Sequence, residues 1–125
     1  MMNKGDLIRL RHMVDAAQKA IRFIEGRTRS DLSRDEMLAL ALVRLIEIIG
    51  EAAKNVSDAT RQQFPEIPWK AIAGTRDRLI HGYFEVDMDI VWKIVTEDLP
   101  TLVARLRPHI PSIIDEDADE QGIRG

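Results

Sequence analysis

Residues 38–56 read LALALVRLIEIIGEAAKNV, and their apolar side chains recur at alternating intervals of four and three. On an α-helix this spacing aligns one row of side chains along a single face: Leu38, Leu42, Leu45, Ile49, Ala52 and Val56. Ala41, Ile46 and Ile48 widen the row. Ser33 offers an N-cap oxygen, and Glu36, three residues later, completes a capping-box pattern. The sequence therefore predicts a central, most buried helix over about residues 34–56.

Helical patterns flank this segment on both sides. A second apolar row predicts a first helix over about residues 6–25, with Gly26 as its C-terminal cap. Residues 27–33 are polar and predict a link. After the central helix, Ser57 can cap a short helix that ends at Phe64, because Pro65 follows.

Two further helices complete the pattern. Pro68 suits the first position of a helix that continues to Ile80. Asp87 can cap a last helix, and Pro100 inside that helix predicts a kink. No strand alternation or internal repeat is present in the sequence. The predicted fold class is therefore all-α, an up-and-down bundle of four main helices plus a short helix.

The composition fits one globular domain. The chain has 125 residues, of which 45% are apolar and 31% charged, enough for a single hydrophobic core. We predict a helical domain over residues 1–110 and an acidic, flexible tail over residues 111–125. The net charge of −3 argues mildly against a nucleic-acid partner, but without the acidic tail the remaining body is slightly positive. A local basic surface is therefore compatible with the composition.

The sequence offers no pattern for a membrane, a metal or a cofactor. No apolar run approaches the roughly 20 residues of a membrane span, and the start lacks a signal-peptide core, so we expect a cytoplasmic protein. Cysteine is absent, and His12, His81 and His109 are widely separated. No glycine-rich phosphate loop or nucleophile elbow occurs. Any catalysis should therefore be metal-independent and should use arginine and histidine.

Arg76 is unusual for its position. Projected on a helix that begins at Pro68, it falls near the middle of a broad apolar stripe. A guanidinium that faces a core or an interface keeps its charge and needs a partner. One reading is structural, an ion pair with Glu47 or Glu51 of the central helix. The other is that Arg76 serves a functional site, and position alone does not decide between them.

His81 follows Arg76 by five residues, about 140° away on an ideal helix, so the two would not share a face. They converge if the helix ends at His81, or if two copies of the chain meet across a two-fold axis. Asp77 is four residues before His81, on its face, and can orient the imidazole. The alternative is a helix-terminal histidine stabilised by the helix dipole, with Asp77 in an ordinary surface pair.

Residues 76–83, RDRLIHGY, resemble a known motif. An arginine, a polar residue and a histidine at this spacing are similar to the motif of the HEPN superfamily. The extension through Gly82 and Tyr83 resembles HepT-like toxins of HEPN toxin–antitoxin systems. Further stretches occur in the same order in HepT-like chains: residues 48–53, 64–69, 72–74, 91–92 and 98–100. The resemblance covers about residues 5–107.

This resemblance implies a homodimer in which both copies of the motif face one cleft, and a metal-independent nuclease that cuts transfer or messenger RNA. By that analogy His81 is the general acid or base and Arg76 stabilises charge on the scissile phosphate. Asp77 positions His81 or the substrate, and Glu51 tethers Arg76 as a supporting residue. The resemblance also implies a minimal nucleotidyltransferase antitoxin that transfers AMP onto Tyr83. Added phosphate there would place negative charge and bulk beside the RNA site.

Two alternatives to the nuclease stay open. One is a non-catalytic HEPN dimer that binds a nucleotide or a partner protein, and the other is a purely structural dimer. For Tyr83, the alternative is that it packs with Phe84 over the end of the bundle. In many HepT-like chains the position of Asp77 is an asparagine, and a carboxylate there repels phosphate unless it is tied to His81 or Arg78.

Overall fold

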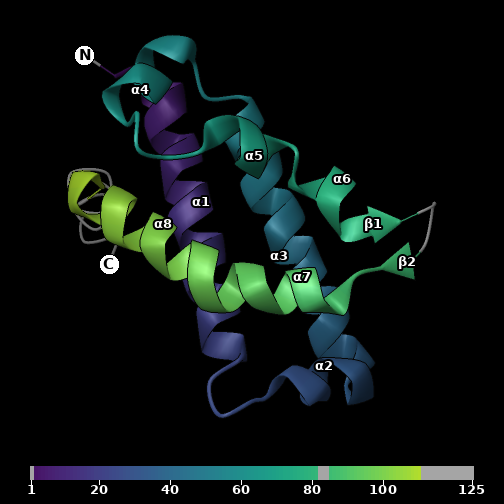
Figure 1. The fold of residues 1–125 in the computed structure, drawn as a ribbon. Helices are drawn as coiled ribbons and strands as arrows, with labels where there is room; N and C mark the ends of the chain where they lie inside the picture. The colour runs from purple at the N-terminus through teal and green to yellow at the C-terminus, as the bar shows by residue number, and fades with distance from the viewer. Residues whose placement is uncertain (1, 82–84, 111–125) are drawn as a thin grey trace, which may run out of the picture.

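Two long helices form the centre of the protein, which a computed structural model describes over residues 2–81 and 85–110. Helix α1 (Lys4–Phe23) and helix α3 (Glu36–Lys54) run antiparallel and pack against each other. A third helical stretch crosses them (Figure 1), made of α7 (Met88–Lys93), the π-helical turn η1 (Ile94–Asp98) and α8 (Leu99–Leu106). The predicted all-α fold class is confirmed.

Short elements connect and cover these helices. They are α2 (Arg29–Arg34), α4 (Asp58–Gln63), α5 (Trp69–Ala73), α6 (Thr75–Leu79) and the 3₁₀ turn η2 (Arg107–His109). Two strands, β1 (Ile80–His81) and β2 (Glu85–Val86), form a small antiparallel pair, which the sequence did not predict. Ile80 lies opposite Val86, and His81 lies opposite Glu85.

The apolar row of residues 38–56 forms the middle of the core, as predicted. All six of its members are buried: Leu38, Leu42, Leu45, Ile49, Ala52 and Val56. They pack against buried side chains of α1 and of the crossing helix, among them Leu10, Val14, Val91, Val95, Leu102 and Leu106. The intervals read from the sequence therefore identify the buried face of α3 correctly.

The expected capping box at Ser33 and Glu36 is wrong. The predicted polar link contains the helix α2, whose start is held by the Asp31 carboxylate as it accepts the backbone N–H of Thr28 at 2.7 Å. Asp35 then caps α3, accepting the backbone N–H of Leu38 at 3.0 Å. An aspartate directly before the first helical residue takes the role assigned to the serine, because its oxygen reaches the free N–H groups of the first turn. The caps predicted at Ser57 and Asp87 are confirmed.

The helix predicted from Pro68 to Ile80 is instead two short helices. Gly74 ends α5 and begins α6, and α6 stops at Leu79. The Thr75 hydroxyl donates to the carbonyls of Ala71 and Ile72 at 3.0 and 2.8 Å, which satisfies groups at the end of α5. The break lies against α3, where a Cβ on Gly50 would be only 3.2 Å from the carbonyl oxygen of Ile72.

The irregularity expected at Pro100 falls just before it. The helix continues through Pro100 into α8, and the preceding turn, Ile94–Asp98, widens to a π-helix. A π turn is one way in which a helix absorbs a disturbance in its hydrogen-bond ladder. The prediction of a local disturbance therefore holds, but it takes the form of a wider turn.

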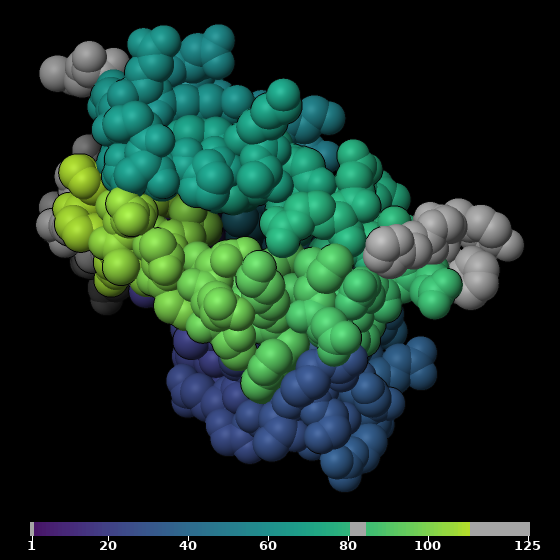
Figure 2. Space-filling model, viewed as in Figure 1, coloured from purple at the N-terminus to yellow at the C-terminus, as the bar shows by residue number. Residues whose placement is uncertain are grey.

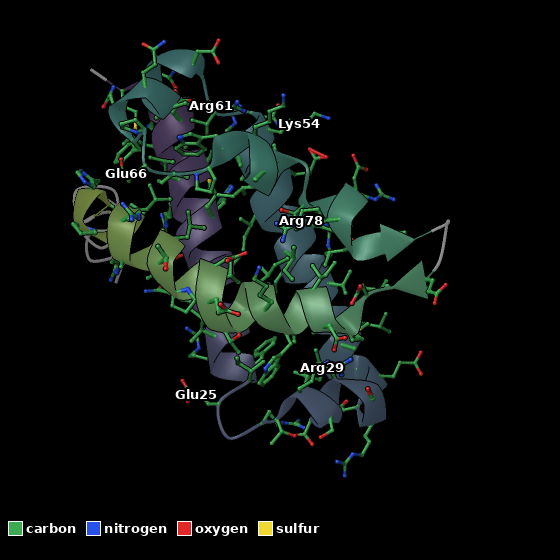
Figure 3. All side chains as sticks on the ribbon, in the orientation of Figure 1. Glu25, Arg29, Lys54, Arg61, Glu66 and Arg78 are labelled. Carbon is green, nitrogen blue, oxygen red and sulfur yellow. The ribbon has the colours of Figure 1, made fainter. Side chains whose placement is uncertain are left out.

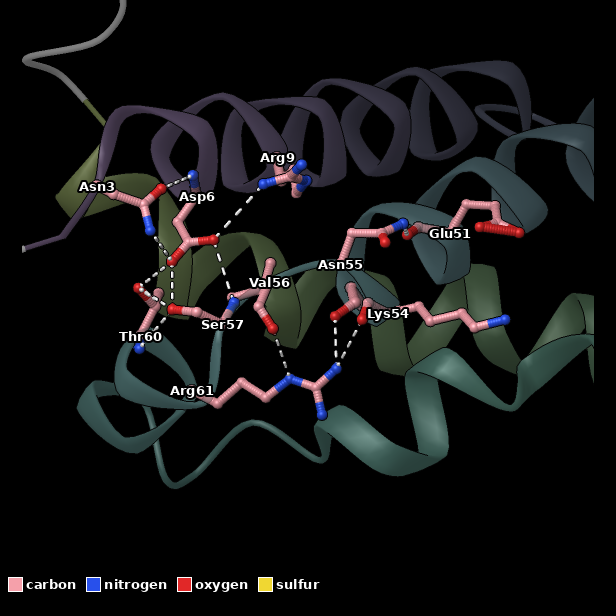
Figure 4. Close-up of polar contacts among 11 residues, drawn as sticks. Asn3, Asp6, Arg9, Glu51, Lys54, Asn55, Val56, Ser57, Thr60 and Arg61 are labelled. Atoms are coloured by element: carbon pink, nitrogen blue, oxygen red, sulfur yellow. Dashed lines mark hydrogen bonds and ion pairs between the residues drawn. The ribbon is translucent and has the colours of Figure 1, made fainter.

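A buried carboxylate joins the start of α1 to the start of α4 (Figure 4). Asp6, 1% exposed, accepts hydrogen bonds from the hydroxyls of Ser57 and Thr60 at 2.5 and 2.6 Å, and from the backbone N–H of Ser57 at 3.1 Å. Nearby, the Arg61 guanidinium donates to three backbone carbonyls at the C-terminal end of α3, those of Ala53, Lys54 and Val56. The contacts of Arg61 fix the end of α3 that borders the candidate site.

None of the helices in the described part of the chain is both long and apolar enough to cross a membrane. The predicted acidic tail, residues 111–125, lies outside the described residues.

Candidate active site

Arg76 and Asp77 lie together at a groove between α6 and α3. The groove has a volume of about 410 Å³. The α3 side contributes Arg44, Ile46, Glu47, Gly50, Glu51 and Lys54, and the α5–α6 side contributes Ala73, Gly74, Arg76 and Asp77. The fold thus brings the predicted site residues Arg76, Asp77 and Glu51 to one surface, although 25 positions separate Glu51 from Arg76 in the sequence.

Arg76 is exposed rather than centred on a buried apolar stripe. The sequence-based projection failed because the helix breaks at Gly74, so α6 does not continue the face that α5 presents to the core. The direct ion pair expected between Arg76 and Glu51 or Glu47 is also not present among the described residues. Its donors are therefore free, within residues 2–81 and 85–110, to bind an oxyanion.

The groove carries three positive and three negative side chains. Arg44, Lys54 and Arg76 face it together with Glu47, Glu51 and Asp77, and Arg44 and Glu47 form a loose pair at 3.9 Å. All of them except Glu47 are exposed, so water screens their fields. A single copy of the chain consequently presents a polar, charge-balanced groove and not a basic patch.

His81 lies two residues beyond the end of α6, in strand β1. The expectation that Asp77 and His81 share one helical face is therefore wrong, because the helix has ended and the backbone is extended at His81. The strand pair and a hydrogen bond from the backbone N–H of Asp87 to the carbonyl of Leu79, at 2.8 Å, fix where the chain leaves α6. Tyr83 lies outside the described residues.

Arg44 and Lys54 also line the groove and were not predicted from the sequence. Together with Glu47 and Glu51, they recur at intervals of three and four on α3, opposite its buried row. That polar stripe was visible in the sequence as the complement of the apolar one. The periodicity of the sequence did not reveal that α6 packs beside that stripe.

A second hollow adjoins the groove and shares Arg44 and Glu51 with it. Its other walls include Ile8 and His12 of α1 and Ile48 of α3. Ile8 is 41% exposed. Two further apolar residues of α3 are also exposed: Met37 at 83% and Leu40 at 60%. The surface beside the groove therefore carries apolar side chains that the described part of one chain leaves open to water.

The described residues hold no group of three or more histidine or carboxylate side chains arranged to bind a metal ion.

A comparison with protein families decides the classification. The family model described as "Ribonuclease HepT-like" matches residues 13–108 of the chain, which include α3, α6 and His81. The chain belongs to the HepT-like ribonuclease family. The predicted resemblance is thus confirmed at the level of the family.

Individual relatives of the chain are named as probable or putative ribonucleases. The chain is 44% identical over 95 residues to "Probable ribonuclease HepT" of Thermococcus cleftensis, a match that covers 73% of this chain and 86% of the relative. It is 38% identical over 98 residues to "Putative RNase TTE0752" of Caldanaerobacter subterraneus subsp. tengcongensis, covering 78% and 88%. "Putative RNase MJ1380" of Methanocaldococcus jannaschii is 37% identical over 90 residues, covering 72% and 83%. No solved structure matches the chain.

Proposed function

We propose that the chain is a metal-independent endoribonuclease and the toxin of a toxin–antitoxin system, with Arg76, Asp77 and His81 as its catalytic residues. The observation that carries this proposal is the state of Arg76. It is exposed in a groove, without an ion pair to any described residue, on a helix that ends two residues before His81. An arginine without an ion pair, followed five residues later in the sequence by a histidine, suits phosphate chemistry, because guanidinium donors match phosphate oxygens.

The reaction needs no metal in this proposal. One histidine removes the proton of the RNA 2′-hydroxyl, whose oxygen attacks the adjacent phosphorus. The bond from phosphorus to the leaving 5′-oxygen breaks, and that oxygen takes up the proton that the histidine gained, directly or through water. Arg76 stabilises the negative charge that grows on the phosphate oxygens, and Asp77 positions His81 or the substrate.

The active form is a homodimer, in which the groove of one copy is half of the site. A single groove is charge-balanced, and a second copy adds a second Arg76. Each copy also contributes the His81 that follows its own α6. The apolar residues Ile8, Met37 and Leu40 suit such a contact, since they are exposed on the two helices that border the groove and its neighbouring hollow.

Leu40→Asp tests this contact. It should shift the protein from dimer to monomer in sedimentation velocity, because a charge replaces an apolar contact. Ala104→Asp on the exposed surface of α8 serves as the control. An unchanged dimer for Leu40→Asp would contradict the proposed face.

A minimal nucleotidyltransferase antitoxin controls the activity by transferring AMP from ATP onto the Tyr83 hydroxyl. Tyr83 follows His81 by two residues in the sequence, and AMP on its hydroxyl would add negative charge and bulk that oppose the binding of RNA phosphate. Intact-mass measurement after incubation with ATP and the antitoxin should show the mass of AMP on the wild type and none on Tyr83→Phe. Equal labelling of both proteins would exclude Tyr83 as the acceptor.

RNA cleavage in the presence of a chelator tests the enzyme itself. Arg76→Ala and His81→Ala should each lower the rate by about 100-fold or more, because each removes a group that acts on the transition state. Arg107→Ala, an equivalent change of an exposed arginine far from the groove in sequence, should stay near the wild-type rate. Full activity of His81→Ala would disprove its assignment. Intact RNA with the wild type would favour the alternative, a non-catalytic dimer that binds a nucleotide or partner protein.

A further inference from the structure

A separate cavity lies on the other side of α6 from the candidate active site. It has a volume of about 240 Å³ and is enclosed by α3, the segment that leads into α5, α5 and α6, and the crossing helix from Ile94 to Arg105. Figure 2 shows the hollow between the teal α5 region and the green crossing helix. Among the residues that the structure describes, Ile46 alone lines both this cavity and the groove of Arg76.

The walls of this cavity are mostly apolar. Ile49, Ile67, Ile94 and Leu102 reach it from the buried core, and Ile72 is half-buried beside them. A dry apolar cavity of roughly 150 Å³ already holds benzene. The space next to α6 can therefore accept an aromatic ring or a branched aliphatic group with a short chain attached.

Four exposed charged side chains surround the apolar part: Glu66, Arg78, Asp98 and Arg105. They come from three places in the sequence, and Figure 3 labels two of them, Arg78 on α6 and Glu66 in the segment before α5. Within residues 2–81 and 85–110, none of the four forms an ion pair. The cavity thus presents two cations and two anions that are not matched to one another.

The crossing helix departs from regular geometry at this cavity. The π-helical turn runs from Ile94 to Asp98, and both of these residues line the cavity, as does Leu99 directly after it. Short π-helical turns are rare in proteins and occur frequently at functional sites. The helix is therefore irregular at the wall where a ligand would contact it.

We propose that this cavity binds a free α-amino acid with a large apolar side chain. The side chain would occupy the apolar part, the carboxylate would bind Arg78 or Arg105, and the ammonium group would bind Asp98 or Glu66. A zwitterion matches a site with two charges of each sign. Both carboxylates would repel a purely anionic ligand, and both guanidinium groups would repel a purely cationic one. The site is distinct from the RNA site, since α6 directs Arg78 into the cavity and Arg76 and Asp77 into the groove.

Calorimetry with four probes tests the ligand class and uses no RNA, so its outcome is independent of the nuclease proposal. L-phenylalanine or L-leucine should bind saturably to the full-length protein. N-acetyl-L-phenylalanine, which lacks the cation, and L-phenylalaninamide, which lacks the anion, should bind at least about tenfold more weakly than L-phenylalanine. Absence of saturable binding by both amino acids, or equal binding of either blocked derivative, would overturn the proposal.

Substitutions locate the site. Ala71 is exposed and lines the cavity, so Ala71→Trp should block it and abolish binding, whereas Ala104→Trp, also exposed but outside the cavity, should bind as the wild type does. Neutral variants of the four charged residues test the charges: Arg78→Gln and Arg105→Gln for the cations, and Glu66→Gln and Asp98→Asn for the anions. At least one variant of each sign should weaken binding by about tenfold. These variants keep the test valid if Ala71→Trp fails to fold. Wild-type affinity in both arginine variants, or in both carboxylate variants, would refute the assignment.

Discussion

Asp6→Ala should destabilise the fold strongly, although Asp6 lies in the first turn of α1 and is remote from the groove in sequence. The carboxylate is 1% exposed and accepts four hydrogen bonds: two from hydroxyls, one from the backbone of Ser57 and one from the side-chain amide of Asn3. Removing it leaves the hydroxyl of Thr60, itself 1% exposed, without its acceptor at 2.6 Å. The backbone N–H of Ser57 loses its partner as well.

The size of the stability loss follows from the hydrogen-bond donors that are left without an acceptor. A buried polar group left without a partner costs about 1–3 kcal/mol. Two such groups lose their partner, but the hydroxyls of Ser57 and Thr60 can turn toward each other and recover part of the lost energy. The free energy of unfolding should therefore fall by roughly 3 kcal/mol. Asp6→Asn should lose only about half as much, because the amide oxygen still accepts and the hydroxyls can rotate to accept from its NH₂ group.

The charge of Asp6 adds a pH dependence. Burial raises the pKa of this carboxyl, but the hydrogen bonds from Ser57 and Thr60 and the positive charge of Arg9 outweigh it and hold the pKa below its usual value of 3.8. The folded state therefore binds fewer protons than the unfolded state. The stabilisation is complete above pH 3.8 and is lost as the pH falls through the lower folded pKa. The difference in stability between the wild type and Asp6→Asn should shrink over that acidic range.

Urea unfolding followed by circular dichroism, at one protein concentration so that dimerisation is held constant, measures these differences. Asp15→Ala, which alters an exposed carboxylate of the same helix, is the control and should change stability by less than about 0.5 kcal/mol. If Asp6→Ala matched that control, the carboxylate would not be a link between α1 and α4. A gap between wild type and Asp6→Asn that widens in acid would refute the pKa argument.

Three further substitutions test how the groove is held. Gly50→Ala should lower the free energy of unfolding in urea by about 1–2 kcal/mol, because its Cβ would lie 3.2 Å from the Ile72 carbonyl oxygen. Unchanged stability would show that α5 is not held close to α3. Arg61→Ala should speed amide hydrogen exchange at the C-terminal end of α3 and lower the free energy of unfolding by about 1–2 kcal/mol, since three carbonyls lose their donor. Unaltered exchange would contradict the capping role. Leu79→Ala removes a side chain that is 0% exposed and should lower stability by about 2–5 kcal/mol, and a loss near zero would mean that α6 is not anchored by it.

Local patterns in the sequence predicted the helices well. The row from Leu38 to Val56 identified the buried face of α3, and Ser57 and Asp87 were correctly assigned as caps. These features depend on residues within one or two helical turns, so the information is contained in a short window. The family resemblance rested on such short stretches in order, and it was confirmed by the match over residues 13–108.

The geometry of the site was not predictable in the same way. The break at Gly74 occurs where α5 lies close to Gly50, which is 24 positions earlier in the sequence. Without that contact, residues 68–80 have the pattern of one amphipathic helix, and Arg76 was placed on a buried face. The groove likewise depends on α6 packing beside the polar stripe of α3, a tertiary contact that helical periodicity cannot supply.

RNA cleavage by a mixture of two inactive variants tests the central claim, that the site is shared between two copies. Arg76→Ala and His81→Ala should each be inactive alone. After subunit exchange at equal amounts, half of the dimers are mixed, and the shared site of each has one intact Arg76 and one intact His81. Activity should therefore rise far above that of either variant alone, to at most about half of the wild type. A mixture that stays as inactive as its components, while the wild type cleaves RNA, would contradict a catalytic site completed by the second copy.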